Sequence, residues 1–444
     1  MAIDCQLAIG PEVARPARPH PVAPVAVAAA LAAVLAACGP APHATDAAGK
    51  SANDAALSAD VVHSWTSGGE LKAIAAVADA FNARGGAWHD AAVAGFDNAG
   101  ALGINRMVGG EPPSAMAFVA GPALNDLADR GMLTPIGELT GQRDWPSRLP
   151  PALTAAVSRG GQPMAVPLNL HEQSLFFWSR AVLAKAGVAH VPANWPEFFA
   201  ALDAVQAQGA IPLALGGQAW QESTLFNAVL GTVLGKSGYE KVYVSRDPVT
   251  ILGPSFRQAV EIFGRLRRYV DANAPGRNWN DATQLVIADR AALLVMGDWA
   301  LSEFTLAAKA PEVDFSCRVG LHDDLAIVGS DVMAFPRART ETARRAQHLL
   351  AEVMLDPQVQ HEFARRLGPL PARLDAPVDD LHPCMRHAAG LMRGAATAVP
   401  TPYMTLPPDV LGEIDDVIGE FWSDPSMSSE TMARRFADVL RTAT

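Results

Sequence analysis

The stretch VVHSWTSGGELKAIAAVADAFN, residues 61–82, decides the fold class of this chain. A pair of β-branched valines starts it, and the run Ser-Gly-Gly at 67–69 interrupts the strand pattern. Apolar side chains then recur at helical spacing, at positions 71, 74, 77 and 81. The stretch therefore predicts a short strand, a tight loop and a helix. Such a unit places its loop at the carboxyl end of a sheet, where open α/β folds bind ligands.

The predicted loop carries an aromatic and an acidic residue, Trp65 and Glu70, among small hydroxyl residues. An indole face beside hydrogen-bonding groups suits a sugar ring, because a sugar has an apolar face and a polar rim. The alternative is that Trp65 belongs to the hydrophobic core and that Glu70 is an acidic residue in the first turn of a helix. This stretch alone fits both interpretations.

Length and composition describe a globular chain with at least two lobes. Its 444 residues exceed what one compact core holds, and 50% hydrophobic against 18% charged residues excludes a disordered chain. The net charge of −11 argues against nucleic acid or an acidic membrane surface as a partner. The sequence has no Cys-x-x-Cys or His-x-x-x-His spacing, so we expect no metal site and no cofactor.

Residues 1–37 have the features of a secretory signal, with Arg15 and Arg18 ahead of an apolar run that is short for a permanent membrane span. The run ends in Leu-Ala-Ala-Cys, which resembles a bacterial lipobox. This ending implies export to the periplasm or cell envelope, with Cys38 as the lipidated first residue and the lipid as the only membrane anchor. The alternative is ordinary cleavage with an unmodified cysteine. Residues 38–58 then predict a flexible tether.

Further along the chain, strands and helices alternate, which predicts an α/β fold with a mostly parallel sheet. The expected strands cover 91–96, 115–119, 175–178, 211–215, 291–296 and 327–335. The expected helices cover 100–107, 222–235, 254–272, 408–422 and 428–441, with further helix starts at Asn194 and at Asp356-Pro357.

Four tryptophans follow predicted strands, each beside amide, carboxylate or glycine residues. Side chains of this kind match sugar hydroxyls, and indole faces match the C–H face of a sugar. One such loop is a weak signal, but four from different parts of the chain favour carbohydrate recognition over four half-buried structural tryptophans. The groups are Trp65 with Glu70, Trp220 with Gln218 and Gln221, Trp279 with Asn278 and Asn280, and Trp299 with Asp298.

Six blocks of sequence carry a family resemblance through their order and spacing. They are WTSGGE at 65–70, AVAG at 92–95, VPLNLH at 166–171, GGQAWQ at 216–221, APGRNWN at 274–280 and MGDWA at 296–300. Through these blocks, residues from about 59 to 440 resemble an extracellular solute-binding protein of the carbohydrate ABC-transporter type. The glucose/mannose-binding members are the most similar.

The resemblance implies a two-lobe α/β fold of the periplasmic-binding-protein (Venus flytrap) type in a monomer. The hinge between the lobes would be crossed three times, near residues 167, 329 and 368. The implied N-terminal lobe comprises 59–166 and 330–367, and the implied C-terminal lobe comprises 167–329 and 368–444. The same comparison implies a disulfide between Cys317 and Cys384.

The resemblance also implies a receptor without enzymatic activity. Such a receptor captures a carbohydrate, either a monosaccharide such as glucose or mannose or a small oligosaccharide, and delivers it to the permease subunits of an ABC importer. The chain has no G-x-x-x-x-G-K-[ST] sequence, so we expect a separate subunit to hydrolyse ATP. The expected ligand contacts are Trp65, Glu70, His171, Trp220, Trp279, Asn280 and Asp298.

Three positions depart from the glucose binders. Ser64 stands where they have a second tryptophan, Ala120 where they have a lysine, and Asn227 where they have an acidic residue. These departures change the size and hydrogen-bond pattern of the implied pocket. A larger or different saccharide, or a polyol, therefore fits the sequence as well as glucose does.

Two other functions remain open at this point. A secreted glycoside hydrolase or lyase could use Glu70 and Asp298 as an acid–base pair, although neither residue lies in a recognisable catalytic motif. A lipoprotein that senses a ligand and passes the signal to a partner protein has the same sequence features as a transport receptor.

Overall fold

The computed structural model describes residues 57–442 of the chain. The predicted signal segment at 1–37 and the predicted lipidation site at Cys38 lie outside the described residues. Most of the predicted tether lies outside them as well, but its last two residues belong to strand β1, Leu57–His63.

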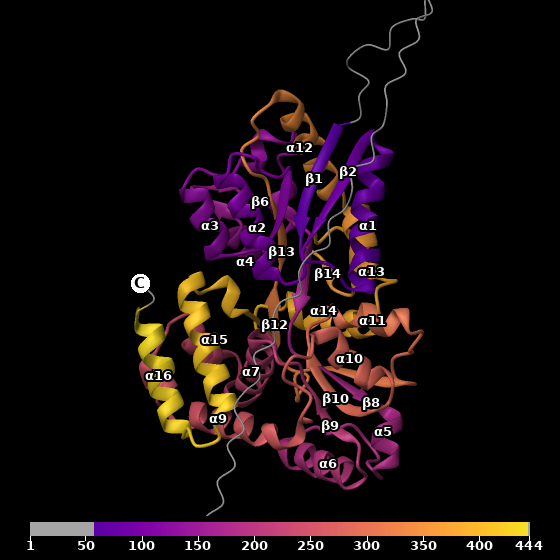
Figure 1. The fold of residues 1–444 in the computed structure, drawn as a ribbon, viewed down its shortest axis with the longest axis vertical. Coiled ribbons are helices and arrows are strands. Elements are labelled where there is room, and N and C mark those ends of the chain that lie inside the picture. The colour runs from indigo at the N-terminus through magenta and orange to yellow at the C-terminus, as the bar shows by residue number, and fades with distance from the viewer. Residues whose placement is uncertain (1–56, 443–444) are drawn as a thin grey trace, which may run out of the picture. The chain divides into compact units, whose positions relative to one another are not determined.

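The opening stretch forms the predicted strand, loop and helix. Strand β1 leads through a short loop into helix α1, Gly68–Ala83, which buries Ile74, Val77 and Phe81. Ser67 caps the start of the helix because its side chain accepts a hydrogen bond from the backbone N–H of Glu70. Figure 1 shows α1 beside β1 and β2.

A five-stranded sheet contains β1 and has the order β2-β1-β3-β13-β6. Its strands are β1, β2 (Gly86–Ala92), β3 (Ala115–Val119), β13 (Asp331–Ala334) and β6 (Ala165–Pro167). β1 pairs in parallel with β2 and β3, as predicted, whereas β13 pairs antiparallel with β3 and β6. The expectation of a mostly parallel sheet therefore holds only for the first three strands.

Two boundaries in this sheet differ from the prediction. The strand expected at 91–96 is β2 and ends at Ala92, because β2 pairs residue for residue with β1, whose last residue is His63. Gly95 then takes a φ of 90° and precedes helix α2, Phe96–Val108, which starts four residues before the expected helix. Helix α3, Pro122–Asp129, follows β3.

A second sheet has four strands in the order β11-β8-β10-β9. They are β8 (Leu175–Ser179), β9 (Ile211–Ala214), β10 (Ala291–Met296) and β11 (Phe315–Val319). The helices between them are α5 (Arg180–Lys185), α6 (Trp195–Ala207), α7 (Ala219–Tyr243), α8 (Pro248–Ile251), α9 (Pro254–Leu266) and α10 (Trp279–Ile287). Trp220 and Trp279 therefore lie in the first turns of helices. The loops that were predicted to carry these two tryptophans end before them.

A third sheet, with the order β14-β7-β12-β15, receives strands from segments that are far apart in the sequence. They are β7 (Asn169–Glu172), β12 (Ala326–Gly329), β14 (Leu370–Pro371) and β15 (Ala398–Pro400). The strand predicted at 327–335 is in fact two strands in two sheets, because β12 ends at Gly329 and β13 begins at Asp331. Ser330 between them is buried and donates its hydroxyl to the carbonyl of Asn169 at 2.7 Å.

The remaining α-helices are α4 (Pro151–Ala156), α11 (Ala300–Leu306), α12 (Glu341–Met354), α13 (Pro357–Leu367), α14 (Pro383–Arg393), α15 (Pro408–Ser423) and α16 (Ser429–Thr442). The last two lie side by side in Figure 1 and match the predicted helices to within one residue. A disulfide joins Cys317 of β11 to Cys384 of α14, as predicted. None of the helices within residues 57–442 combines the length and the apolar character that a membrane crossing requires.

Candidate functional site

The loop before α1 is held by a reciprocal pair of hydrogen bonds. The Ser67 hydroxyl accepts from the N–H of Glu70 at 3.3 Å, and the Glu70 carboxylate accepts from the N–H groups of Ser67 at 2.9 Å and Thr66 at 3.0 Å. This capping box uses the carboxylate that was predicted to contact the ligand. Burial raises the pKa of Glu70, and the negative charge of Asp331 raises it further.

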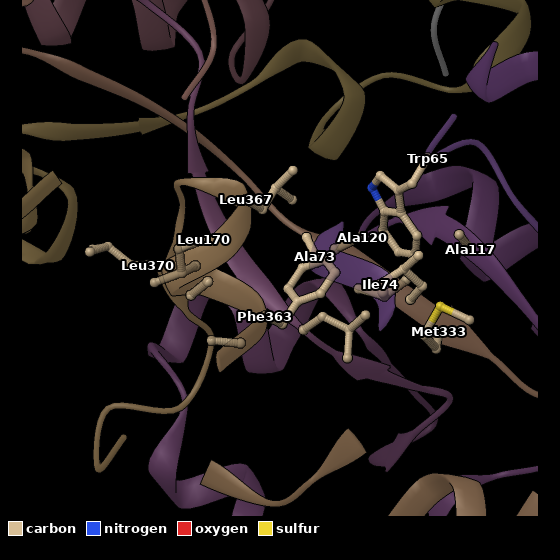
Figure 2. Close-up of a cluster of buried hydrophobic side chains, with 14 of the residues drawn as sticks. Trp65, Ala73, Ile74, Ala117, Ala120, Leu170, Met333, Phe363, Leu367 and Leu370 are labelled. Carbon is tan, nitrogen blue, oxygen red and sulfur yellow. The ribbon is translucent and has the colours of Figure 1, made fainter. Parts of the chain in front are cut away.

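Trp65 lies in a hydrophobic cluster in this structure. Its indole is 5% exposed and meets the ring of Phe363 edge to face, with the ring centroids 5.4 Å apart. Figure 2 shows Trp65 near Ala73, Ile74 and Ala120 in the same cluster. The packing fits the core interpretation of Trp65, while its predicted stacking on a sugar stays a prediction.

His171 lies on β7 between two carboxylates that come from distant parts of the chain. Its Nδ1 is 2.5 Å from Oδ1 of Asp298, which follows β10, and its Nε2 is 2.7 Å from Oδ2 of Asp331, the first residue of β13. Burial alone would lower the pKa of His171, but the charges and hydrogen bonds of the two carboxylates raise it to about 10. The imidazole is therefore charged at neutral pH.

The two carboxylates have different surroundings. Asp298 is fully buried, and its second oxygen accepts from the backbone N–H of Glu172 at 2.7 Å. Asp331 has a side chain that is 14% exposed, and its Oδ2 also accepts from the amide of Asn169 at 3.0 Å. Burial raises the pKa of Asp331, but the charge of His171 and the hydrogen bonds from His171 and Asn169 together outweigh burial and hold that pKa below its usual value.

Two aromatic residues connect this cluster to helix α7. The ring of Trp299 meets His171 edge to face at a centroid distance of 5.4 Å, and Trp220 lies 6.1 Å from Trp299. Trp220 also lines a cavity of about 10 Å³, near the size of one water molecule, together with Thr224 and Tyr403. Three of the predicted site residues, His171, Asp298 and Trp220, are thus linked through Trp299.

Trp279 and Asn280 are half-buried at the start of α10. The loop before them is fixed against the loop before Trp220, because the N–H of Gly217 donates to the carbonyl of Arg277 at 3.1 Å and Arg277 donates to the carbonyl of Leu215 at 2.9 Å. Within residues 57–442, neither Trp279 nor Asn280 makes a hydrogen bond to the His171 cluster.

Sequence reasoning did not assign Asn169 or Asp331 to the site. Asn169 belongs to the VPLNLH block and lies two residues before His171, so both side chains point to one face of β7. Asp331 was visible as a polar interruption of an apolar strand. An acidic residue that interrupts an apolar strand was the signal that could have assigned Asp331 to the site.

Comparison with known proteins places the chain in a family. The family model of bacterial extracellular solute-binding proteins matches residues 70–316. A probable sugar-binding periplasmic protein of Rhizobium meliloti (strain 1021) is 35% identical over 333 residues, which cover 74% of this chain and 80% of the relative. A probable sugar-binding periplasmic protein of Brucella melitensis biotype 1 is 34% identical over 332 residues, covering 74% of this chain and 78% of the relative.

Solved structures share the fold at low sequence identity. A chitin oligosaccharide binding protein superposes with a TM-score of 0.74 at 18% identity, covering 87% of this chain and 99% of the other. Maltose-bound MalE3 of T. maritima gives a TM-score of 0.70 at 18% identity, covering 87% and 99%. The fold is the predicted two-lobe periplasmic-binding-protein fold, and the chain belongs to the bacterial extracellular solute-binding protein family.

Proposed function

We propose that this protein is the substrate-binding component of an ABC importer, which captures a carbohydrate between two lobes and delivers it to a membrane permease. The observation that carries the proposal is the Asp298–His171–Asp331 cluster beside Trp299 and Trp220, since it combines hydrogen-bond acceptors with aromatic faces. The names of the relatives from Rhizobium meliloti and Brucella melitensis support a sugar as the ligand.

Residues 59–166 and 330–367 form one lobe of the proposed receptor, and residues 167–329 and 368–444 form the other. The sheet topology supports this division, because the chain passes from β6 to β7 and from β12 to β13 within a few residues. The proposed ligand lies between the lobes and stabilises their closed arrangement, since only that arrangement offers contacts from both.

Contacts between the two proposed lobes support a closed arrangement in this structure. The backbone N–H of Gly69, at the start of α1, donates to Oε1 of Glu303 on α11 at 3.2 Å. A Cβ placed on Gly69 would lie 2.2 Å from the hydroxyl oxygen of Ser302, so the helix start and α11 touch without space for a side chain.

The residues of the proposed ligand site are Trp65, Glu70, His171, Trp220, Trp279, Asn280 and Asp298. A glycoside hydrolase would use the carboxylates of Glu70 and Asp298 as an acid–base pair. Both carboxylates are engaged in internal hydrogen bonds, which favours a receptor over such an enzyme. The proposed receptor is an exported monomer that is anchored to the cell envelope through a lipid on Cys38 and docks on permease subunits.

A thermal-shift screen tests the proposed function. The purified protein is heated in the presence of monosaccharides, disaccharides, polyols and sugar phosphates. A bound saccharide raises the melting temperature by mass action, because it binds the folded chain alone. A shift produced by a peptide or another solute, with no shift from any saccharide or polyol, contradicts the proposal.

A further inference from the structure

We propose that Asp331 contacts the bound ligand directly, as a hydrogen-bond acceptor, and that His171 is the positioning residue that aims it. This inference rests on the proposed carbohydrate function and adds a residue that the sequence did not assign to the site. It also gives His171 a role different from the direct ligand contact that was predicted for it.

The neighbouring carboxylate, Asp298, is poorly placed to accept from a ligand. Its side chain has no exposed area, one oxygen is held by Nδ1 of His171 and the other by the N–H of Glu172. His171 itself has no nitrogen to offer, because both ring nitrogens are used by the two carboxylates. Among these three groups, the ligand can reach the carboxylate of Asp331.

Asp331 combines a fixed orientation with an available oxygen. Its Oδ2 accepts from His171 and from the buried Asn169, while the N–H of Asp331 donates back to Oδ1 of Asn169 at 2.8 Å. Within residues 57–442, the hydrogen-bond partners of the carboxylate all bind Oδ2, and the side chain remains 14% exposed. A carboxylate held in this way meets a hydroxyl or amine donor without losing rotamer freedom.

The charges around Asp331 indicate which ligands the site favours. The carboxylates of Asp298 and Asp331 both contact the single imidazolium of His171, and the charge of Asp331 also acts on Glu70, where burial and this charge together raise the pKa. Burial raises the pKa of the neighbouring Glu172 to about 8, which keeps it mostly neutral at pH 7. The balance is negative, so a uronic acid would be repelled, while neutral and amino sugars would not. Asp331 therefore determines specificity against acidic sugars as well as affinity.

Titration calorimetry with matched sugars tests the inference. The probes are glucose, mannose and galactose, each with its 2-amino-2-deoxy form and its uronic acid. We expect Asp331→Asn to weaken binding of the neutral sugar about tenfold or more, because a hydrogen bond to a charged group is lost. The ratio of the affinity for the neutral sugar to the affinity for its uronic acid should also become smaller. Asp331→Glu should restore part of the affinity.

A double-mutant cycle separates positioning from general structural support. His171→Gln should weaken binding in the wild-type background and have little further effect in the Asp331→Asn background, because its action passes through Asp331. Asp323→Asn, which removes the carboxylate of a 2.6 Å pair with the exposed His387, is the matched control and should leave affinity unchanged. Melting curves verify that each variant is folded.

The outcomes that contradict the inference differ from those that contradict the proposed function. Sugar binding by the wild type with equal affinity in Asp331→Asn overturns the role of Asp331 alone. Additive losses in the double variant overturn the positioning role of His171. A wild-type protein that binds none of the saccharides in the thermal-shift screen overturns the proposed function, and this inference falls with it.

Discussion

His171 links the stability of the folded chain to pH. Its folded-state pKa of about 10 lies above the ordinary 6.5, so the stabilisation from its proton is complete below about 6.5 and is lost as the pH rises through 10. Glu172 acts in the same direction, because burial raises its pKa to about 8 and the folded chain holds a proton that the unfolded chain releases.

Urea unfolding at several pH values should show this dependence. We expect the free energy of unfolding to fall between about pH 7 and about pH 10, with a slope of at most about 1.4 kcal/mol per pH unit for each proton involved. His171→Gln should make the free energy of unfolding depend less steeply on pH in the upper part of this pH range. An identical slope in the variant and the wild type would assign the pH dependence to other groups.

Trp220 is the aromatic residue with the clearest place in the proposed site, since its ring lies 6.1 Å from that of Trp299. We expect Trp220→Ala to lower saccharide affinity at least about tenfold, because stacking and apolar contact are lost together, without unfolding the protein. Trp422→Ala is the matched control, as Trp422 is also half-buried but packs on Phe263 with ring centroids 4.8 Å apart. Unchanged affinity in Trp220→Ala would remove this residue from the site.

Single residues were predictable from the sequence where a local motif marked them. His171, Trp220 and Asp298 lie in motifs of this kind, and the structure links them. Asp331 reaches His171 across 160 positions of sequence, and that contact depends on where β12 ends and β13 begins. Local patterns carry no information on such long-range contacts.

Among the elements, helix α1 shows how one sequence signal serves two structural purposes. Glu70 was considered both as a ligand contact and as an acidic residue in the first turn, and the structure uses it in a capping box with Ser67.

We expect Ser67→Ala to lower the free energy of unfolding by about 1 kcal/mol, because an N-cap acceptor is lost. Ser67→Asp should retain stability in the same urea titration, and a loss as large in Ser67→Asp as in Ser67→Ala would contradict the capping role.

Element boundaries were predictable where caps or prolines fix them. Asn194 and Asp356 are N-caps as predicted, since their side chains accept from the N–H groups of Glu197 and Gln358. The division of the segment 327–335 was not predictable, because both halves are apolar while they pair with different sheets. Strand pairing, which is a tertiary property, decides where one strand ends and the next begins.

At the scale of the whole molecule, α1 and α11 form one of the contacts between the proposed lobes. Because a methyl group at position 69 would lie 2.2 Å from the Ser302 hydroxyl, Gly69→Ala should separate the helix start from α11 and weaken the Gly69–Glu303 hydrogen bond. We expect weaker saccharide binding, since the proposed ligand relies on the closed arrangement.

Scattering and calorimetry together distinguish this effect from simple destabilisation. With saccharide present, Gly69→Ala should keep a larger radius of gyration than the wild type, and adding Ser302→Gly should restore both compactness and affinity by making space for the methyl group. Gly412→Ala is the control, because Gly412 lies on helix α15 with no atom within 4 Å of an added Cβ, and alanine is favoured over glycine in a helix. If Gly69→Ala binds saccharide as tightly as Gly412→Ala does, the contact is not part of closure. Closure must then depend on other contacts between the proposed lobes, such as the His171 cluster, which joins β7, β13 and the loop after β10.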